Sequence, residues 1–187
     1  KPQRVELLSK LFKGHTVREL IKKIDEKSQS DALIKELELN TSINRKVEEL
    51  SGGELQRLAI IAAALKSADV YYFDEPSSFL DITHRIKAAK LIRNLKENAA
   101  VVVVEHDLAT LDYVSDEIQI VYGEQACYGI FSQSKAVRRG INEYMDGFLP
   151  DENLKFRPYP IKFEDTPRER IISQNILIEF PELKKSF

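Results

Sequence analysis

The stretch DVYYFDEP at residues 69–76, together with AAVVVVEHD at residues 99–107, decides the fold of this chain. Each stretch is a short, unbroken apolar run, which is typical of a strand buried on both faces. Between them, Asp81 precedes an apolar stripe at helical spacing that runs from Ala88 to Leu95, and aspartate is a preferred helix N-cap. Two such strands joined by a helix predict a parallel βαβ unit within a sheet, and therefore an α/β fold.

Both predicted strands end in ionisable residues. Asp74 and Glu75 follow the first strand, and Glu105, His106 and Asp107 follow the second. The carboxyl ends of parallel strands share one edge of the sheet, and ligands of open α/β sheets bind there. At such an edge Asp74 could hold Mg²⁺, Glu75 could act as a general base on water, and His106 could reach a terminal phosphate. Acids at strand ends are also common in ordinary surface loops, so this pattern alone leaves both interpretations open.

The run KVEELSGGELQRLAIIAAAL at residues 46–65 contains the chain's one pair of adjacent glycines. Ser51 and Glu54 have the spacing of a capping box, which predicts a helix beginning here. Capping does not explain Gly52 and Gly53, since each glycine costs about 1 kcal/mol relative to alanine inside a helix. Glycines allow a ligand or another backbone to approach closely, and the N–H groups of a helix start attract anions. The run is therefore a candidate phosphate site.

The composition fits one globular domain, or one domain with an appendage: 187 residues, 43% apolar, 31% charged, net charge −2. This near-neutral balance excludes a general nucleic-acid coat, although it allows a local basic patch. The single cysteine, Cys127, excludes an internal disulfide and a cysteine-based metal site, and it favours a reducing, cytoplasmic setting. No run reaches the roughly 18–20 apolar residues of a membrane span. His15 and His84 lie among charged residues, and we expect both at the surface.

Three regions are expected along the chain. Residues 1–57 hold a small, charged helical region and the Ser-Gly-Gly motif, and residues 58–131 hold the predicted βαβ unit. The second region ends in DEIQIVYGEQACYGIF, which is compatible with a hairpin. Residues 132–187 mix basic residues, aromatics and prolines, and we expect a hinge or linker there. Four cations of this last region lie close together and could form a basic surface: Arg138, Arg139, Lys155 and Arg157.

The order of these motifs resembles the second half of an ATP-binding-cassette (ABC) ATPase domain, over roughly residues 3–125. The matching elements are the signature motif (LSGGELQR), the Walker B strand (VYYFDEP), the D-loop (SSFLD) and the switch histidine, His106. Gln3 occupies the place of that family's Q-loop glutamine. The resemblance implies a partial ABC-type ATPase domain with a parallel sheet core and a small helical subdomain.

The resemblance also implies a role for each site residue. Glu75 would be the general base and Asp74 would hold Mg²⁺ together with Gln3, while Gln3 and His106 would sense the terminal phosphate. Asp81 would couple two cassettes. Nucleotide held mainly by the opposite cassette would be bound by the signature residues: Ser51, Gly52, Gly53 and Glu54.

The segment after Phe131 narrows the resemblance further. AVRRGINEYMDGFLPDENLKFRP and the closing FPELKKSF are similar to the hinge of ABC subfamily E, the RNase L inhibitor family. Members of that family are twin-cassette ATPases that split ribosomes for recycling. The implied cofactors are ATP and Mg²⁺, with iron–sulfur clusters in the full-length protein. The implied partners are the second cassette, ribosomal subunits and release or initiation factors, with no membrane.

Two elements of that family are missing from this sequence. No glycine is followed by lysine, so the Walker A motif G-x-x-x-x-G-K-[ST] is absent, and so is a cysteine-rich iron–sulfur region. We expect both upstream of Lys1, and a second cassette after Phe187. The chain alone is therefore predicted not to hydrolyse ATP. Two other functions remain open, namely the ATPase subunit of a membrane transporter and a non-catalytic interaction module.

Overall fold

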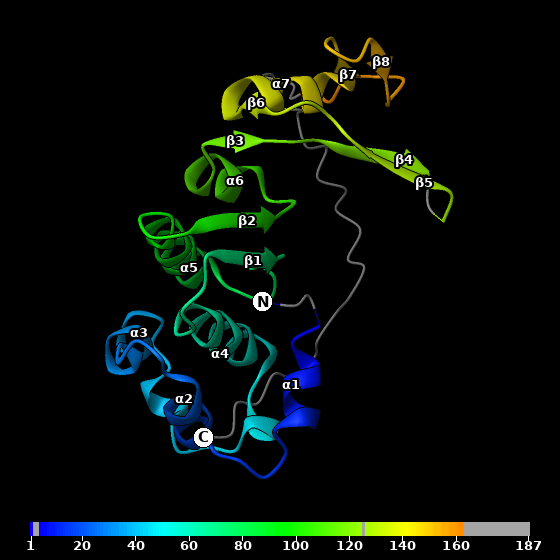
Figure 1. Ribbon diagram of the computed structural model, residues 1–187. Coiled ribbons are helices and arrows are strands. Elements are labelled where there is room, and N and C mark those ends of the chain that lie inside the picture. The colour runs from blue at the N-terminus through cyan, green and yellow to red at the C-terminus, as the bar shows by residue number, and fades with distance from the viewer. Residues whose placement is uncertain (2–3, 125, 163–187) are drawn as a thin grey trace, which may run out of the picture.

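The computed structural model describes residues 1, 4–124 and 126–162. Figure 1 shows these residues as a column, with a helical region at one end, the βαβ unit in the middle and small sheets at the other end. The α-helices are α1 (Glu6–Leu11), α2 (Val17–Ile24), α3 (Ser30–Glu36), α4 (Gly52–Ala64), α5 (Ile82–Leu95), α6 (Leu108–Val114) and α7 (Val137–Asp146), with 3₁₀ turns η1 (Asn40–Ser42) and η2 (Val47–Glu49). The strands are β1 (Val70–Asp74), β2 (Ala100–Val104), β3 (Glu117–Ile118), β4 (Val121–Glu124), β5 (Tyr128–Phe131), β6 (Lys135–Ala136), β7 (Phe148–Leu149) and β8 (Leu154–Lys155).

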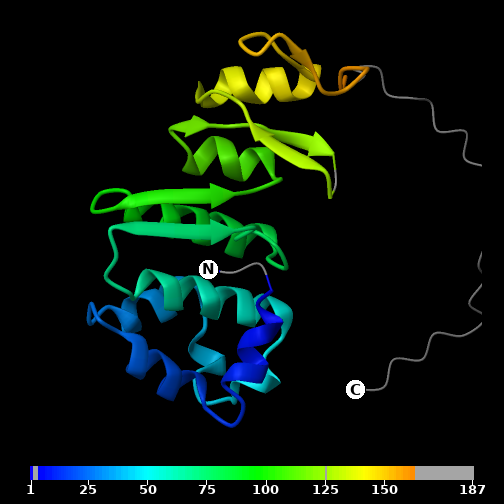
Figure 2. The same ribbon diagram turned by 45° about the vertical axis from the view of Figure 1, so that its right-hand side comes forward.

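The predicted βαβ unit is confirmed. Strands β1 and β2 pair in parallel, in a register that runs from Val70 opposite Ala100 to Asp74 opposite Val104. Helix α5 connects them and lies beside the strand pair (Figure 2). The side chain of Asp81 accepts a hydrogen bond from the His84 amide, so Asp81 caps α5 as its residue type predicted.

Burial of both strand faces, however, was a wrong expectation for the described residues. Tyr71 and Phe73 are buried, whereas Val70, Tyr72 and Val102 are 59%, 53% and 45% exposed. Helix α4 contacts β1 and α5 contacts β2, and both leave the alternate side chains accessible. An apolar run predicts that a strand can be buried on two faces, but which face is covered depends on elements elsewhere in the fold.

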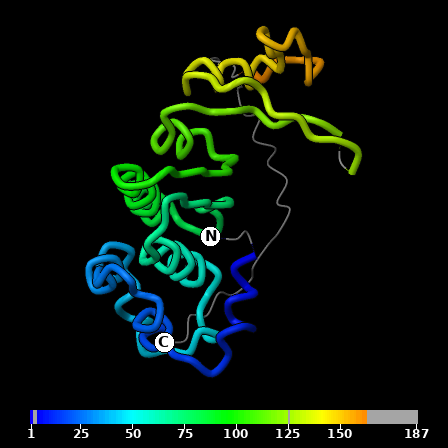
Figure 3. Tube along the Cα trace, in the orientation of Figure 1, coloured from blue at the N-terminus to red at the C-terminus, as the bar shows by residue number. Residues whose placement is uncertain are grey.

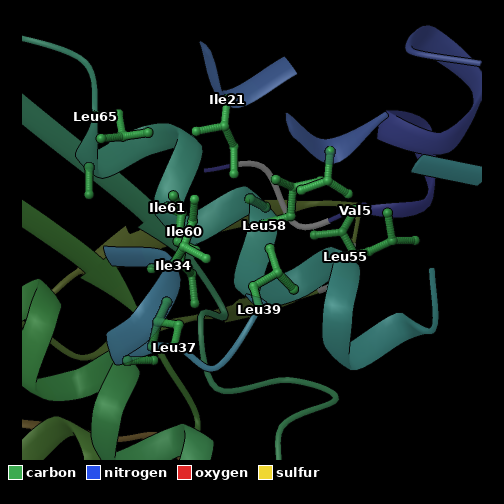
Figure 4. Close-up of a cluster of buried hydrophobic side chains, with 14 of the residues drawn as sticks. Val5, Ile21, Ile34, Leu37, Leu39, Leu55, Leu58, Ile60, Ile61 and Leu65 are labelled. Atoms are coloured by element: carbon green, nitrogen blue, oxygen red, sulfur yellow. The ribbon is translucent and has the colours of Figure 1, made fainter. Parts of the chain in front are cut away.

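The core lies around α4, at the junction of the helical region and the strand pair. Figure 4 shows side chains of the helical region gathered around Leu55, Leu58 and Ile60 of α4. They include Val5, just before α1, Ile21 of α2, Ile34 of α3 and Leu39, just before η1. A helix that is apolar on nearly all sides belongs in a protein interior, and here α4 is packed between α1, α2, α3, α5 and β1. The tube in Figure 3 shows how the chain returns from the helical region through α4 to enter β1. The core therefore fixes α4 beside the carboxyl edge of the strands.

The part beyond the βαβ unit is built from short antiparallel pairs. The predicted hairpin is confirmed as β4 with β5, while β3 pairs with β6 and β7 with β8. Helix α7 ends at Gly147, whose φ of 73° is the left-handed conformation of a helix C-cap. Lys135 is almost fully buried and its ammonium lies 2.6 Å from Asp151, so an ion pair ties β6 to the segment before β8. Residues 132–162 thus carry regular structure, and the proposed regional boundaries stay a prediction.

Among the residues that the structure describes, no helix has both the length and the hydropathy needed to cross a bilayer.

Candidate functional site at the carboxyl edge of the strands

The structure brings Glu75 and His106 together at the carboxyl edge of β1 and β2. Glu75 Oε1 lies 3.1 Å from His106 Nε2. The Glu75 side chain is 23% exposed and the His106 side chain is 80% exposed, so the pair sits at the surface with its carboxylate partly shielded. The Glu75 amide donates to the Val104 carbonyl at 2.8 Å, which extends the ladder one residue beyond β1. Two strand ends far apart in sequence therefore form one site.

Glu75 adopts an unusual backbone conformation. Its φ is +44°, in the left-handed region that residues other than glycine and asparagine rarely enter. The Ser78 hydroxyl donates to Glu75 Oε2 at 3.2 Å, and Gln56 donates to the Glu75 carbonyl at 2.8 Å. Neither contact was predicted from the sequence. The sequence does contain a hint of the Gln56 contact. A glutamine inside an apolar helical run is expected to be buried, and a buried amide needs polar partners.

The same edge attracts a positive charge. The ammonium of Lys1 donates to the carbonyls of Asp74 at 2.5 Å and Glu75 at 3.2 Å. Burial lowers the pKa of the Lys1 ammonium, while the nearby charges of Asp74, Glu75 and Glu105 oppose that shift. These carboxylates thus partly offset the cost of burying a cation at this edge, where the sequence predicts Mg²⁺.

The donor set fits Mg²⁺ better than a metal held in an all-protein cage. The carboxylate of Asp74 is a hard oxygen ligand of the kind that Mg²⁺ prefers, and this ion is usually bound by one or two carboxylates together with substrate phosphates and water. Within the described residues no cluster of three or more His, Cys, Asp or Glu side chains could hold a metal. Gln3, the other predicted Mg²⁺ ligand, lies outside the described residues.

The predicted capping box at the start of α4 is confirmed. The Glu54 amide donates to Ser51 Oγ at 3.3 Å, and Glu54 Oε2 accepts from the Ser51 amide at 2.8 Å. Glu54 is also paired with Arg45 at 3.1 Å and hydrogen-bonded to Ser42. Burial disfavours the Glu54 carboxylate, but the hydrogen bonds from Ser42 and Ser51 and the charge of Arg45 outweigh it, and they lower its pKa to about 2. The Glu54 carboxylate is thus occupied within the chain.

Gly52 and Gly53 lie against the D-loop of the same chain. A Cβ atom at Gly53 would lie 2.9 Å from the Phe79 carbonyl oxygen, and one at Gly52 would lie 3.6 Å from the Phe79 ring. Phe79 itself is 64% exposed and has a φ of +62°. Packing against Phe79 within the chain therefore leaves no room for a side chain at position 53. The sequence analysis missed this requirement and predicted only that the two glycines give access to a ligand.

His84 contradicts the expectation of a free surface residue. Its side chain is 19% exposed, and Nδ1 lies 2.6 Å from Asp81. Its Nε2 lies 2.9 Å from Arg57 Nη1 and 3.2 Å from Glu38. His84 of α5 thus contacts Arg57 of α4 and Glu38, which lies just after α3. His15, by contrast, is exposed as expected.

The four cations of the tail do not form one uniform surface. Arg139 pairs with Glu143 and Asp151, at 2.7 Å and 2.6 Å. Arg157 donates to the carbonyls of Met145 at 2.7 Å and Tyr159 at 3.0 Å. The guanidinium groups of Arg139 and Arg157 are thus used in contacts within residues 132–162. Arg138 and Lys155 remain exposed and are the better candidates for contact with an anionic partner.

Comparison with known proteins gives one consistent family. A family model described as ABC transporter matches residues 2–78, which include the signature motif and the Asp74-Glu75 pair. An uncharacterized ABC transporter ATP-binding protein of Methanocaldococcus jannaschii is 50% identical over 100% of this chain and 30% of the relative. ABC transporter E family member 1 of Arabidopsis thaliana is 43% identical over 87% of this chain and 27% of the relative. The chain thus spans less than a third of the length of these relatives.

A solved structure agrees with these sequence relatives. The crystal structure of a complex of the archaeal ribosomal stalk protein aP1 and the archaeal ribosome recycling factor aABCE1 matches with a TM-score of 0.86 and 52% identity, over 100% of this chain and 36% of that chain. The match includes residues 132–162, which ordinary fold similarity to a cassette would not require. The chain therefore belongs to the ABC ATPase family, and its relatives place it in the E subfamily.

Proposed function

We propose that this chain is part of a cytoplasmic twin-cassette ABC ATPase that uses ATP binding and hydrolysis to split ribosomes for recycling. The observation that carries the ATPase assignment is the 3.1 Å approach of Glu75 to His106 beside Asp74. A carboxylate within hydrogen-bond reach of an imidazole, next to a second carboxylate suited to Mg²⁺, is a suitable arrangement for phosphoryl transfer to water. The ribosomal role rests on the solved relative, which is named a ribosome recycling factor.

Each residue then has a distinct role. Glu75 orients and deprotonates the attacking water, and His106, which contacts Glu75 and faces solvent, meets the terminal phosphate. Asp74 binds Mg²⁺, with Gln3 as a second ligand. The metal, when bound, neutralises charge on the phosphates. His106 also orients one oxygen of Glu75, since its Nε2 lies within hydrogen-bond distance of Oε1.

The signature motif serves a second nucleotide site. Ser51, Gly52 and Gly53 begin α4, where backbone N–H groups attract a phosphate, and the nucleotide itself would be held by the opposite cassette. Glu54 supports this loop by holding Ser51 in place, since it accepts from both the amide and the hydroxyl of Ser51, each at 2.8 Å. Asp81, at the start of α5, would couple the two cassettes. The Walker A loop and the iron–sulfur clusters would come from other parts of the full-length protein, so this chain alone is expected to be inactive.

Two other functions are weaker. A transporter subunit would share the nucleotide site, but the E family relative of Arabidopsis thaliana matches 87% of this chain, and the solved ribosome recycling factor matches all of it, including the segment after Phe131. A non-catalytic module would have no use for a carboxylate held against an imidazole at the strand edge. Co-sedimentation of the full-length protein with ribosomal subunits, rather than with membranes, distinguishes our proposal from the transporter function.

The catalytic assignment is tested by Glu75→Gln in the full-length protein. Glutamine is nearly isosteric but cannot accept a proton, so ATP should still bind while hydrolysis slows by roughly 10²–10⁴-fold. Glu97→Gln is a matched control, because Glu97 is exposed and lies beyond α5, at the amino end of β2. Wild-type hydrolysis in Glu75→Gln would exclude Glu75 as the base.

A further inference from the structure

Gln56 on α4 lies directly behind the proposed catalytic base. Its side chain is fully buried, and its Nε2 donates to two consecutive carbonyls, those of Glu75 at 2.8 Å and Pro76 at 2.9 Å. Because both partners are acceptors, only the NH₂ end of the amide can face them, and the orientation of the group is fixed. Gln56 therefore bonds to two consecutive peptide groups, Glu75–Pro76 and Pro76–Ser77.

The other end of the same amide is not used. Gln56 Oε1 is buried and has no hydrogen-bond partner in the part of the chain that the structure describes. Burial of an unpaired carbonyl oxygen is unfavourable, and an apolar side chain of similar size would avoid it. Stability alone thus gives a poor reason for glutamine at this position, which points to the two bonds that its NH₂ group donates.

Those bonds fix a backbone that would otherwise relax. Glu75 has a φ of +44°, and its side chain is further held by Ser78 and His106, at 3.2 Å and 3.1 Å. A residue in a rarely populated conformation persists only when its surroundings hold it there. Gln56 supplies that restraint from α4, the helix whose first turn carries Gly52 and Gly53.

We propose that Gln56 is a positioning residue for Glu75, and that it ties the helix that begins with the Ser-Gly-Gly motif to the base of the same cassette. This inference rests on the proposed function, since it needs Glu75 to act in hydrolysis. Gln56 is fully buried, and its NH₂ group bonds to the backbone of Glu75 and Pro76 rather than to the Glu75 carboxylate. It acts by setting where the Glu75 carboxylate stands, and any rotation of α4 on nucleotide binding moves the peptide that carries this carboxylate.

The test is Gln56→Met in the full-length protein, which keeps the volume and removes both donors. Displacement of a catalytic group by about 1 Å can cost on the order of 10²-fold, so kcat should fall by roughly 10–100-fold. Affinity for a non-hydrolysable ATP analogue should stay within about twofold, because the nucleotide contacts are intact. Ile60→Val, also fully buried on α4, is the control for a general loosening of this helix.

A second measurement separates positioning from a structural role. In a Glu75→Gln background, Gln56→Met should cause no further loss in single-turnover hydrolysis, because the group through which it acts is gone. The inference is overturned if Gln56→Met keeps the wild-type kcat, or if its kcat falls no further than that of Ile60→Val. It is also overturned if Gln56→Met slows hydrolysis as strongly in the Glu75→Gln background as it does in the wild type. If Gln56→Met does not fold, Gln56→Asn, which keeps an amide too short to reach both carbonyls, is judged by the same criteria. An inactive Glu75→Gln beside a fully active Gln56→Met would refute only this inference and leave the proposed function standing.

Discussion

Replacement of Gly53 by alanine tests whether the second glycine of the motif is needed within this chain. The new Cβ would lie 2.9 Å from the Phe79 carbonyl oxygen, closer than such atoms normally come, so the D-loop backbone has to shift. Gly52→Ala is the matched control, because it makes the same chemical change one residue earlier. Its Cβ would lie 3.6 Å from the Phe79 ring, which is ordinary contact.

The expected magnitudes follow from these two distances. Alanine favours a helix over glycine by up to about 1 kcal/mol, so Gly52→Ala should be neutral or stabilising. An extra atom forced into a packed site costs about 1–3 kcal/mol, so Gly53→Ala should be destabilising by up to about 2 kcal/mol after the same helix gain. The two variants should therefore differ by about 1–3 kcal/mol in the free energy of local opening of α4.

Amide hydrogen exchange in the full-length protein measures this difference at α4 itself. A factor of ten in exchange corresponds to about 1.4 kcal/mol, so α4 amides should exchange roughly 5- to 150-fold faster in Gly53→Ala than in Gly52→Ala. Equal exchange in the two variants would show that the Phe79 carbonyl does not press on Gly53. If the full-length protein works as proposed, ATP-driven closure of its two cassettes gives a second comparison. Loss of phosphate access alone should impair both variants, whereas displacement of Phe79 should impair mainly Gly53→Ala.

Two further predictions concern stability. Lys135→Met should remove the ammonium that pairs with the nearly buried Glu143 carboxylate and with Asp151. Amide exchange in α7 and β7 should therefore rise by roughly tenfold or more, whereas Arg138→Ala should leave it unchanged. Glu54 has a pKa of about 2 against an ordinary 4.5, so its stabilising contribution is present above about pH 4.5 and is lost as pH falls towards 2. Acid denaturation of Glu54→Gln should lack this component, and an unchanged acid transition would contradict the assignment.

The sequence predicted those parts of the fold that depend on local pattern. The parallel pairing of β1 with β2, the cap at Asp81 and the capping box at Ser51 each follow from residue types within a short window, and each is confirmed. Regular structure in residues 132–162 was not predicted, because its prolines and mixed charges match those of a linker. There, an almost fully buried Lys135 with its carboxylate partners gives the order that composition alone does not indicate.

The sequence predicted which residues meet at the candidate site, but it did not predict the contacts that hold them there. Asp74, Glu75 and His106 were expected at one edge because parallel strands end together, and the structure brings Glu75 and His106 to 3.1 Å. The contacts of His84 with Glu38 and Arg57 could not be predicted, because they join α5 to α4 and to the segment just after α3. Sequence neighbours predicted a solvated histidine, and packing of the helices overrode them.

The backbone of Glu75 shows why such geometry belongs to the tertiary structure. A left-handed conformation costs a residue with a Cβ about 1–2 kcal/mol, so local preference opposes the position in which the carboxylate is held. Three parts of the chain distant in sequence bond to this residue's backbone: Gln56 and the Lys1 ammonium donate to its carbonyl, and Val104 accepts from its amide. The conformation therefore exists only when α4, β1 and β2 are packed together. The helix that begins with the Ser-Gly-Gly motif thus also bonds to the backbone of the residue that we propose as the base.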